Sequence, residues 1–178
     1  MLLERLGVPF TTRSPDVDES ALPAERPAQL VRRLALAKAQ AVAAQMPSSI
    51  VIGSDQLATF GSQVIGKPGS MENARRQLAS FSGRSVLYLS SFVVLDAETG
   101  RKVADTVETV VNFRNISAEE IDRYLELDQP LDCAGSFKSE RAGISLFTSV
   151  QSDDPTALIG LPLIQVSAAL REFGYQVP

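Results

Sequence analysis

Helix-like and strand-like segments alternate along this chain, and the alternation limits the folds open to it more than any other feature. Residues 27–46 carry small and apolar residues at spacings of three and four, which predicts a helix. The apolar run at 50–53 predicts a short buried strand that ends at a glycine. A second helix is predicted over 71–81, because Ser70 is a good N-cap. Such alternation is typical of an α/β domain.

The second half of the chain continues the pattern. Residues 86–95 and 101–113 are strand-like, and the short Asp-Ala-Glu-Thr-Gly connection between them predicts an antiparallel hairpin. A third helix is predicted to start at Ser117, whose capping-box glutamate lies three positions on, and to end before Pro130. A strand at 143–150 and a closing helix at 163–173 complete the set. We therefore expect an α/β fold with a mixed sheet.

Size and charge narrow the class of protein. The chain has 178 residues, of which 44% are hydrophobic, which is enough for one domain with its own core. It has 17 basic and 21 acidic residues and a net charge of -4, so no basic field is available to bind polymeric nucleic acid. No apolar run approaches the ~20 residues that span a bilayer. We expect a cytoplasmic protein without a membrane or nucleic-acid partner.

The chain contains no histidine and one cysteine. Catalytic triads, His-ligated zinc and disulfides within the chain are therefore excluded, and carboxylates, lysines and hydroxyls must carry any chemistry. We expect Cys133 to be a small buried residue.

Several charged residues have unusual settings, although each also has a structural interpretation. Asp55 follows the predicted strand at 50–53, where α/β folds place ligands. Lys38 adjoins a stripe of alanines, which its stem could simply cross to reach solvent. Lys67 stands in a rigid Gly-Lys-Pro-Gly turn. The loop at 14–27 combines four acidic residues with prolines and is read first as a solvated loop.

An ordered set of short motifs runs through nearly the whole chain: PDVDE at 15–19, LALAKAQA at 34–41, IVIGSDQ at 50–56, GKP at 66–68, ENARRQL at 72–78, CAGSFKSE at 133–140 and LIGLPL at 158–163. Taken together, these motifs resemble the Maf family, in particular the branch that acts on 7-methyl-GTP. The resemblance implies two α/β lobes around a central cleft. It also implies a nucleoside triphosphate pyrophosphatase, a hydrolase that releases pyrophosphate and a monophosphate from modified nucleotides.

The resemblance also implies roles for individual residues. Asp55 matches the family's proton acceptor, and Gln56 and Glu140 match positions that govern which base is accepted. Glu19, Lys38 and Lys67 match polar residues of the cleft. We add Lys138 as a phosphate-binding residue, because it lies two positions from Glu140.

The chemistry of these residues suits that reaction. Hydrolysis at an α-phosphate needs a base, positive charge against the triphosphate and a divalent ion. We assign Asp55 as base or metal-side carboxylate, Glu19 as metal-side carboxylate, and Lys38, Lys67 and Lys138 as phosphate-binding residues. Without histidine, Mg²⁺ or Mn²⁺ bound through oxygen is the expected cofactor. The base and metal roles of Asp55 and Glu19 are not divided, and a homodimer is left open.

Two departures from the family pattern leave alternatives. Members usually begin with a strand and a Ser-x-Ser-Pro-x-Arg-Arg-like loop before a helix that resembles residues 2–7, so we expect this single domain of residues 1–178 to be truncated at its N-terminus. Ser90 and Ser91 stand where the family shows a Thr-Gly pair. A nucleotide-binding regulatory protein with little turnover is therefore the alternative to the enzyme. Another phosphohydrolase on a similar fold is a third, weaker alternative, since no nucleophile motif is present.

Overall fold

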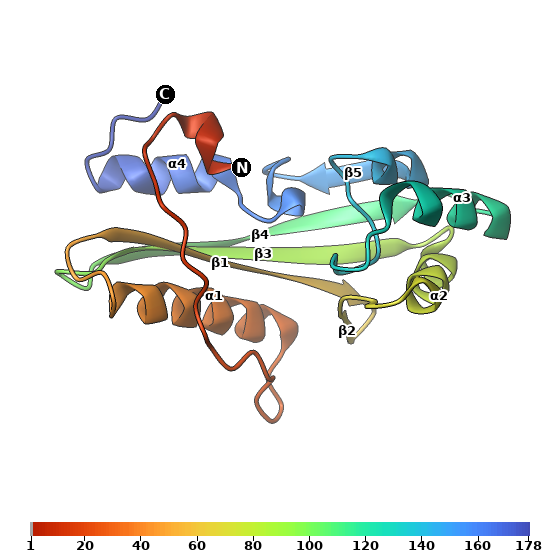
Figure 1. Ribbon diagram of the computed structural model, residues 1–178, viewed down its shortest axis with the longest axis horizontal. Helices are drawn as coiled ribbons and strands as arrows, with labels where there is room; N and C mark the ends of the chain where they lie inside the picture. The colour runs from red at the N-terminus through yellow and green to blue at the C-terminus, as the bar shows by residue number, and fades with distance from the viewer. Residues whose placement is uncertain (1) are drawn as a thin grey trace. The chain divides into compact units, whose positions relative to one another are not determined.

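The structure is a computed structural model that describes residues 2–178, and within that range it has four α-helices and five strands (Figure 1). The helices are α1 (Pro27–Ala43), α2 (Met71–Phe81), α3 (Ala118–Asp128) and α4 (Leu163–Glu172). The strands are β1 (Ile50–Phe60), β2 (Gln63–Ile65), β3 (Ser85–Asp96), β4 (Lys102–Phe113) and β5 (Phe147–Ser152). Short 3-10 helices occur at Leu3–Leu6, Ala142–Leu146 and Ala157–Ile159.

The five strands form one sheet in the order β2-β1-β3-β4-β5. Its outer pairs, β1–β2 and β4–β5, are antiparallel, and β3 and β4 are joined by the short turn that the sequence predicted. The α/β class is therefore confirmed, with the refinement that the sheet is antiparallel. No helix in residues 2–178 is both long enough and apolar enough to span a bilayer.

The chain divides into two compact units, and the boundaries fall inside β1, β3 and β4. Unit 1 comprises residues 1–56, 89–107 and 154–178, and unit 2 comprises residues 57–88 and 108–153.

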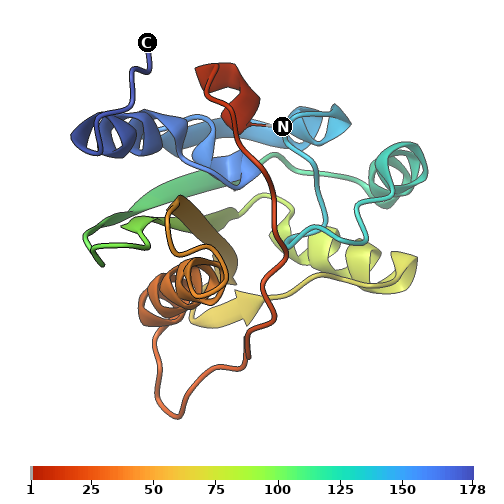
Figure 2. The same cartoon turned by 60° about the vertical axis from the view of Figure 1, so that its left-hand side comes forward.

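Unit 1 has helices on both faces of its strand segments, with α1 on one face and α4 on the other (Figures 1 and 2). Alternate residues of β3 face opposite ways, as in any strand. Val93 and Leu95 pack with Ala35 and Ala39 of α1, whereas Phe92 and Val94 pack with residues of α4. The small side chains of α1 bring that helix close to β1, which places Lys38 of α1 beside the strand.

Unit 2 has a core of aromatic side chains. Phe113 contacts Phe81, Phe137 and Phe147 at ring-centroid distances of 5.5, 5.7 and 5.1 Å. Edge-to-face or tilted pairs of this kind add about 0.5–1.5 kcal/mol each to the burial of the rings. Phe137 is thereby anchored, and with it the loop at 133–140.

The strand predicted at 50–53 is wrong in its length, because β1 continues through Asp55 and Gln56 to Phe60. Gly53 does not end the strand. A Cβ atom at Gly53 would lie 2.5 Å from the carbonyl oxygen of Ala35 and 2.7 Å from the amide nitrogen of Ala39. The glycine is therefore required by the close approach of α1, and Asp55 lies within the strand.

Other boundaries also differ from the prediction. The first helix ends at Ala43, three residues early, and the segment predicted as a strand at 143–150 begins as a 3-10 helix before β5. The short β2 was not predicted, although the Gly61-Ser62 pair before it is a hairpin signal. Cys133 was expected to be buried, but it is only half-buried. The caps at Ser70 and Ser117 are confirmed.

Candidate functional site

Two carboxylates and one ammonium meet in unit 1. The Nζ atom of Lys38 lies 2.6 Å from Oδ1 of Asp55 and 2.7 Å from Oε1 of Glu19. Asp55 projects from β1 toward α1, on the same face as Gly53, and its side chain is only 9% exposed. Glu19 comes from the loop before α1 and is 62% exposed. Three of the predicted site residues are therefore brought together, and Lys38 is an ion-pair partner and not a surface lysine.

The two carboxylates decide the charge of Lys38. Burial lowers the pKa of the ammonium, but its hydrogen bonds to Asp55 and Glu19 outweigh that effect, so the pKa is raised overall. Lys38 is therefore fully charged at neutral pH. Its positive charge in turn favours the charged form of the carboxylates that it contacts.

Gln56 projects to the opposite face of β1, and its amide is already engaged. Its Nε2 atom lies 2.7 Å from the carbonyl oxygen of Ala157, 3.2 Å from that of Leu158 and 2.9 Å from Oγ of Ser90. These three acceptors compete for two amide hydrogens. The structure therefore gives Gln56 a role in holding the turn at 157–160 against β1.

Ser54 and Ser90 strengthen that attachment. The hydroxyl of Ser54 lies 2.9 Å from the carbonyl oxygen of Ser91 and 3.0 Å from that of Gly160, and Ser90 donates to Ala157 at 2.8 Å. Ser90 is one of the two serines that depart from the family's Thr-Gly pair, and its hydroxyl is used in this network.

Sequence reasoning missed Asp154, which organises the chain after that turn. Asp154 is fully buried, and its carboxylate accepts hydrogen bonds from the amide and hydroxyl of Thr156 and from the amide of Ile164 at the start of α4. The Asp-Pro-Thr string at 154–156 was an available signal, since aspartate commonly bonds the amide two residues on.

In unit 2, Lys67 lies in a turn that α2 holds in place. Asn73 donates to the carbonyl oxygen of Pro68 at 2.8 Å, and Gln77, one helical turn later, donates to that of Gly66 at 3.1 Å. Gly69, at the end of the turn, has φ +66° and donates its amide to Leu131. The backbone around Lys67 is therefore fixed, while the lysine itself is exposed.

The loop at 133–140 is held by two tyrosines. Tyr88 donates its hydroxyl to the carbonyl oxygen of Ala134, and Tyr124 accepts the amide of Lys138 at 2.9 Å. Gly135 has φ +79°, and a Cβ atom there would lie 1.9 Å from the Tyr88 hydroxyl, so only glycine fits. Burial raises the pKa of Tyr88 well above its ordinary value, which keeps this hydroxyl a donor.

In unit 2, Lys138 acts electrostatically on both Asp132 and Cys133, whereas Lys67 acts on Asp132 and Glu140 acts on Cys133. Lys138 lies 3.8 Å from the carboxylate of Asp132, and its Nζ atom donates to the carbonyl oxygen of Asp128 at 3.2 Å. Hydrogen bonds from its own amide and from Cys133 lower the pKa of Asp132, and Lys138 and Lys67 lower it further. Burial, Asp132 and Glu140 raise the pKa of Cys133 to about 11, so the thiol stays protonated.

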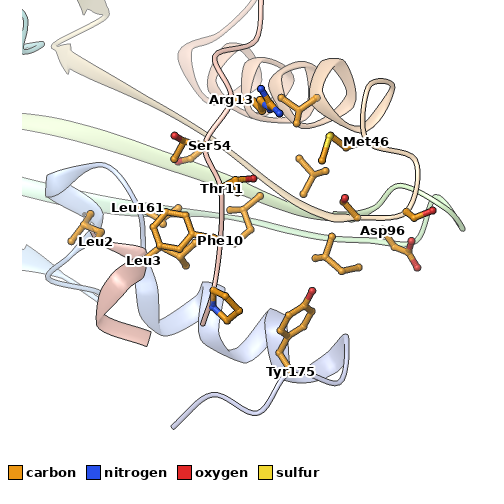
Figure 3. A pocket seen from close by; sticks show the side chains of 18 of the residues that line it. Leu2, Leu3, Phe10, Thr11, Arg13, Met46, Ser54, Asp96, Leu161 and Tyr175 are labelled. Carbon is orange, nitrogen blue, oxygen red and sulfur yellow. The ribbon is translucent and has the colours of Figure 1, made fainter. Parts of the chain in front are cut away.

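A cavity of about 1090 Å³ lies in unit 1 beneath the chain at 9–13 (Figure 3). Phe10 lies beside Leu3 and Leu161 in its wall, and Ser54 and Arg13 also line it. None of the predicted site residues does so. The predicted site residues of unit 1 therefore lie outside this cavity.

Asp55 and Glu19 are the carboxylates of unit 1 that could hold a divalent ion. Across residues 2–178 no three acidic or cysteine side chains gather as metal ligands. One carboxylate oxygen of Asp55 and one of Glu19 both lie within hydrogen-bond distance of the Lys38 ammonium. Mg²⁺ is usually bound through one or two carboxylates, with substrate phosphates and water as the remaining ligands. Asp55 and Glu19 therefore supply the number of carboxylates that such an ion usually takes from a protein.

Comparison with known proteins identifies the family of this chain. The chain belongs to the Maf family, since residues 1–173 match the family described as Maf-like protein. A protein of Pseudomonas putida named 7-methyl-GTP pyrophosphatase is 49% identical over 177 residues, which is 99% of this chain and 92% of that protein. Proteins with the same name from Albidiferax ferrireducens and Bordetella pertussis are 49% and 52% identical, over 99% and 97% of this chain and 88% and 86% of theirs.

Proposed function

We propose that this protein is a nucleotide pyrophosphatase that hydrolyses 7-methyl-GTP to 7-methyl-GMP and pyrophosphate. The observation that carries the proposal is the buried carboxylate of Asp55 held by Lys38 beside Glu19, in a chain about half identical to proteins named for this activity. These three side chains can supply the base and the cation that hydrolysis at an α-phosphate needs, and a second carboxylate as a ligand for the divalent ion.

In the proposed reaction Asp55 is the general base. Its charged carboxylate accepts a proton from water as the water oxygen bonds to the α-phosphorus. The bond from that phosphorus to the oxygen bridging to the β-phosphate breaks, and pyrophosphate leaves with the electron pair. Lys38 keeps Asp55 charged and offsets negative charge that develops on the phosphate. A base positioned in this way typically contributes about 10²–10⁴-fold to the rate.

We also propose that Mg²⁺ or Mn²⁺ binds with the nucleotide and that Glu19 is its first protein ligand. Glu19 is preferred to Asp55 as the metal ligand because its exposed side chain can move to contact an ion, whereas the side chain of Asp55 is buried beside α1. When bound, the ion would neutralise charge on the triphosphate. This division assigns the base role to Asp55 and the metal-side role to Glu19.

In unit 2 we propose that Glu140 favours the methylated base and that Lys67 binds phosphate. Methylation of N7 gives guanine a positive charge, which an exposed carboxylate attracts. Lys67 presents an exposed ammonium on a fixed turn. Lys138 is the weaker candidate for phosphate, because Asp128 and Asp132 already engage its ammonium. Gln56 then acts indirectly, through the turn at 157–160.

The test is a screen of the purified protein against 7-methyl-GTP, GTP, dTTP and UTP with Mg²⁺ or Mn²⁺. We expect equal amounts of monophosphate and pyrophosphate, fastest from 7-methyl-GTP, and no reaction after chelation of the metal. Release of free phosphate would indicate another phosphohydrolase. Tight binding without any release would indicate a regulatory protein.

A further inference from the structure

The loop that carries Glu19 has no regular secondary structure, yet it is tied to α1 by one arginine. Arg33 donates from Nε to Oε1 of Glu25 at 2.7 Å and from Nη2 to Oε2 of Glu25 at 2.9 Å. Its Nη2 atom also lies 2.8 Å from the carbonyl oxygen of Ser20. One guanidinium therefore holds two points of the loop, and Ser20 is the residue next to Glu19.

The loop between these points is folded on itself. Leu22 donates its amide to Oε2 of Glu25 at 2.9 Å, Glu25 donates its amide to the carbonyl oxygen of Leu22 at 3.0 Å, and Ser20 donates its amide to Asp18 at 2.9 Å. Ala24 has φ +61°, which a side chain other than glycine adopts only where the surroundings hold it. The two hydrogen bonds between Leu22 and Glu25, which span Ala24, supply that hold.

We propose that Arg33 is a positioning residue that sets Glu19 beside Lys38 and Asp55, acting through Ser20 and Glu25. Packing cannot fix Glu19, since its side chain is largely exposed. Its position depends on the ion pair with Lys38 and on the neighbouring backbone, which the fork of Arg33 fixes at the Ser20 carbonyl. The inference that this matters for catalysis rests on the proposed function of Glu19.

Arginine is needed at position 33 for a geometric reason. The two bonds to Glu25 and the one to Ser20 all come from a planar group with donors at fixed angles. A lysine could reach one of these acceptors but not all three at once. Arg32 offers a matched control, because it is the preceding residue of the same helix and donates instead to Thr106 on β4.

The pairing also predicts a pH dependence. The hydrogen bond from Arg33, followed by that from the Leu22 amide, lowers the pKa of Glu25. The stabilisation of the loop by the Arg33–Glu25 pair is therefore complete above the ordinary glutamate pKa of about 4.3. This stabilisation is lost as the pH falls through the lowered pKa of Glu25, because the carboxylate then becomes protonated.

The first experiment is amide hydrogen exchange in the nucleotide-free protein, resolved at Ser20, Leu22 and Glu25. We expect Arg33→Gln to speed exchange at these amides by about 10-fold, Arg33→Lys to do so nearly as much, and Arg32→Gln to leave them unchanged. Glu25→Gln should reproduce Arg33→Gln, and the double variant should add little. Unchanged exchange in Arg33→Gln, or equal effects of Arg32→Gln, would overturn the proposal.

The second experiment asks whether Arg33 acts through Glu19. Arg33→Gln should raise the Mn²⁺ concentration for half-maximal pyrophosphate release and the KM by about 5- to 10-fold, with kcat less affected. In a Glu19→Gln background it should have no further effect, and an undiminished effect there would overturn the proposal. If the unaltered protein releases no pyrophosphate, the proposed function fails, while exchange at Ser20 still decides whether Arg33 orders the loop.

Discussion

Replacing Lys38 with Met should destabilise the protein, because it leaves Asp55 buried without its cation. Methionine keeps most of the apolar stem, so the substitution removes charge and hydrogen bonds more than packing. Asp55 is 9% exposed and Lys38 21% exposed, whereas Glu19 is 62% exposed and gains little from an ion pair in solvent. The stability effect therefore arises almost entirely from the Lys38–Asp55 pair.

The expected magnitude follows from that burial. Breaking a fully buried pair by removing one partner costs about 3–5 kcal/mol. Water reaches the exposed fifth of Lys38 and weakens the pair, so we expect a cost somewhat below this range, about 2–3 kcal/mol. For a chain of this length each kcal/mol shifts Tm by roughly 2–4 °C, which gives a decrease of about 4–12 °C.

Thermal and urea unfolding across pH provide the assay. Because the pKa of Lys38 is raised, the pair contributes fully below the unfolded value of about 10.4 and is lost as the pH rises through the folded value. The difference in unfolding free energy between the unaltered protein and Lys38→Met should be constant from about pH 6 to 9 and should narrow above about pH 10.5. Lys102→Met, at an exposed lysine of β4, should change stability by less than about 0.5 kcal/mol. An equal, small effect for both lysines would refute the reasoning.

Three further substitutions test other parts of the site. Gly53→Ala should cost about 1–3 kcal/mol, because its Cβ meets the backbone of α1, while Gly66→Ala, with open space around it, should cost less in the same melting experiment. Gln56→Glu turns a carboxylate toward two carbonyl oxygens, so it should lower Tm without changing the preference among bases. A changed preference at unaltered Tm would mean that Gln56 contacts the base directly. Glu140→Gln should lower kcat/KM for 7-methyl-GTP about 10-fold more than for GTP, and equal losses would exclude base reading.

The features that sequence could predict are those with local signals. The cap at Ser70 and the capping box of Ser117 and Glu120 are contained in four residues each, and both helices begin where predicted. The end of β1 had no such signal. Gly53 has the appearance of a strand terminator, but its role is set by Ala35 and Ala39, which only the folded chain brings to it.

The same distinction holds for the site. Ordered motifs identified Asp55, Lys38 and Glu19 as functional candidates. They did not show that the Lys38 ammonium pairs with both carboxylates. Arg33 and Glu25 could not be paired from sequence, because they are separated by a helix start and an irregular turn without periodicity. The engagement of Gln56 by the turn at 157–160 depends likewise on residues about a hundred positions away.

The central claim is that Asp55 is the base for hydrolysis of 7-methyl-GTP, and the most direct measurement is pyrophosphate release by Asp55→Asn beside the unaltered protein. Asparagine keeps the size of the side chain and an oxygen that can accept from Lys38, so the fold should survive. We predict a kcat lower by at least about 100-fold in a protein that is still folded at the assay temperature. Near-normal turnover by Asp55→Asn, or a loss explained by unfolding, would contradict it.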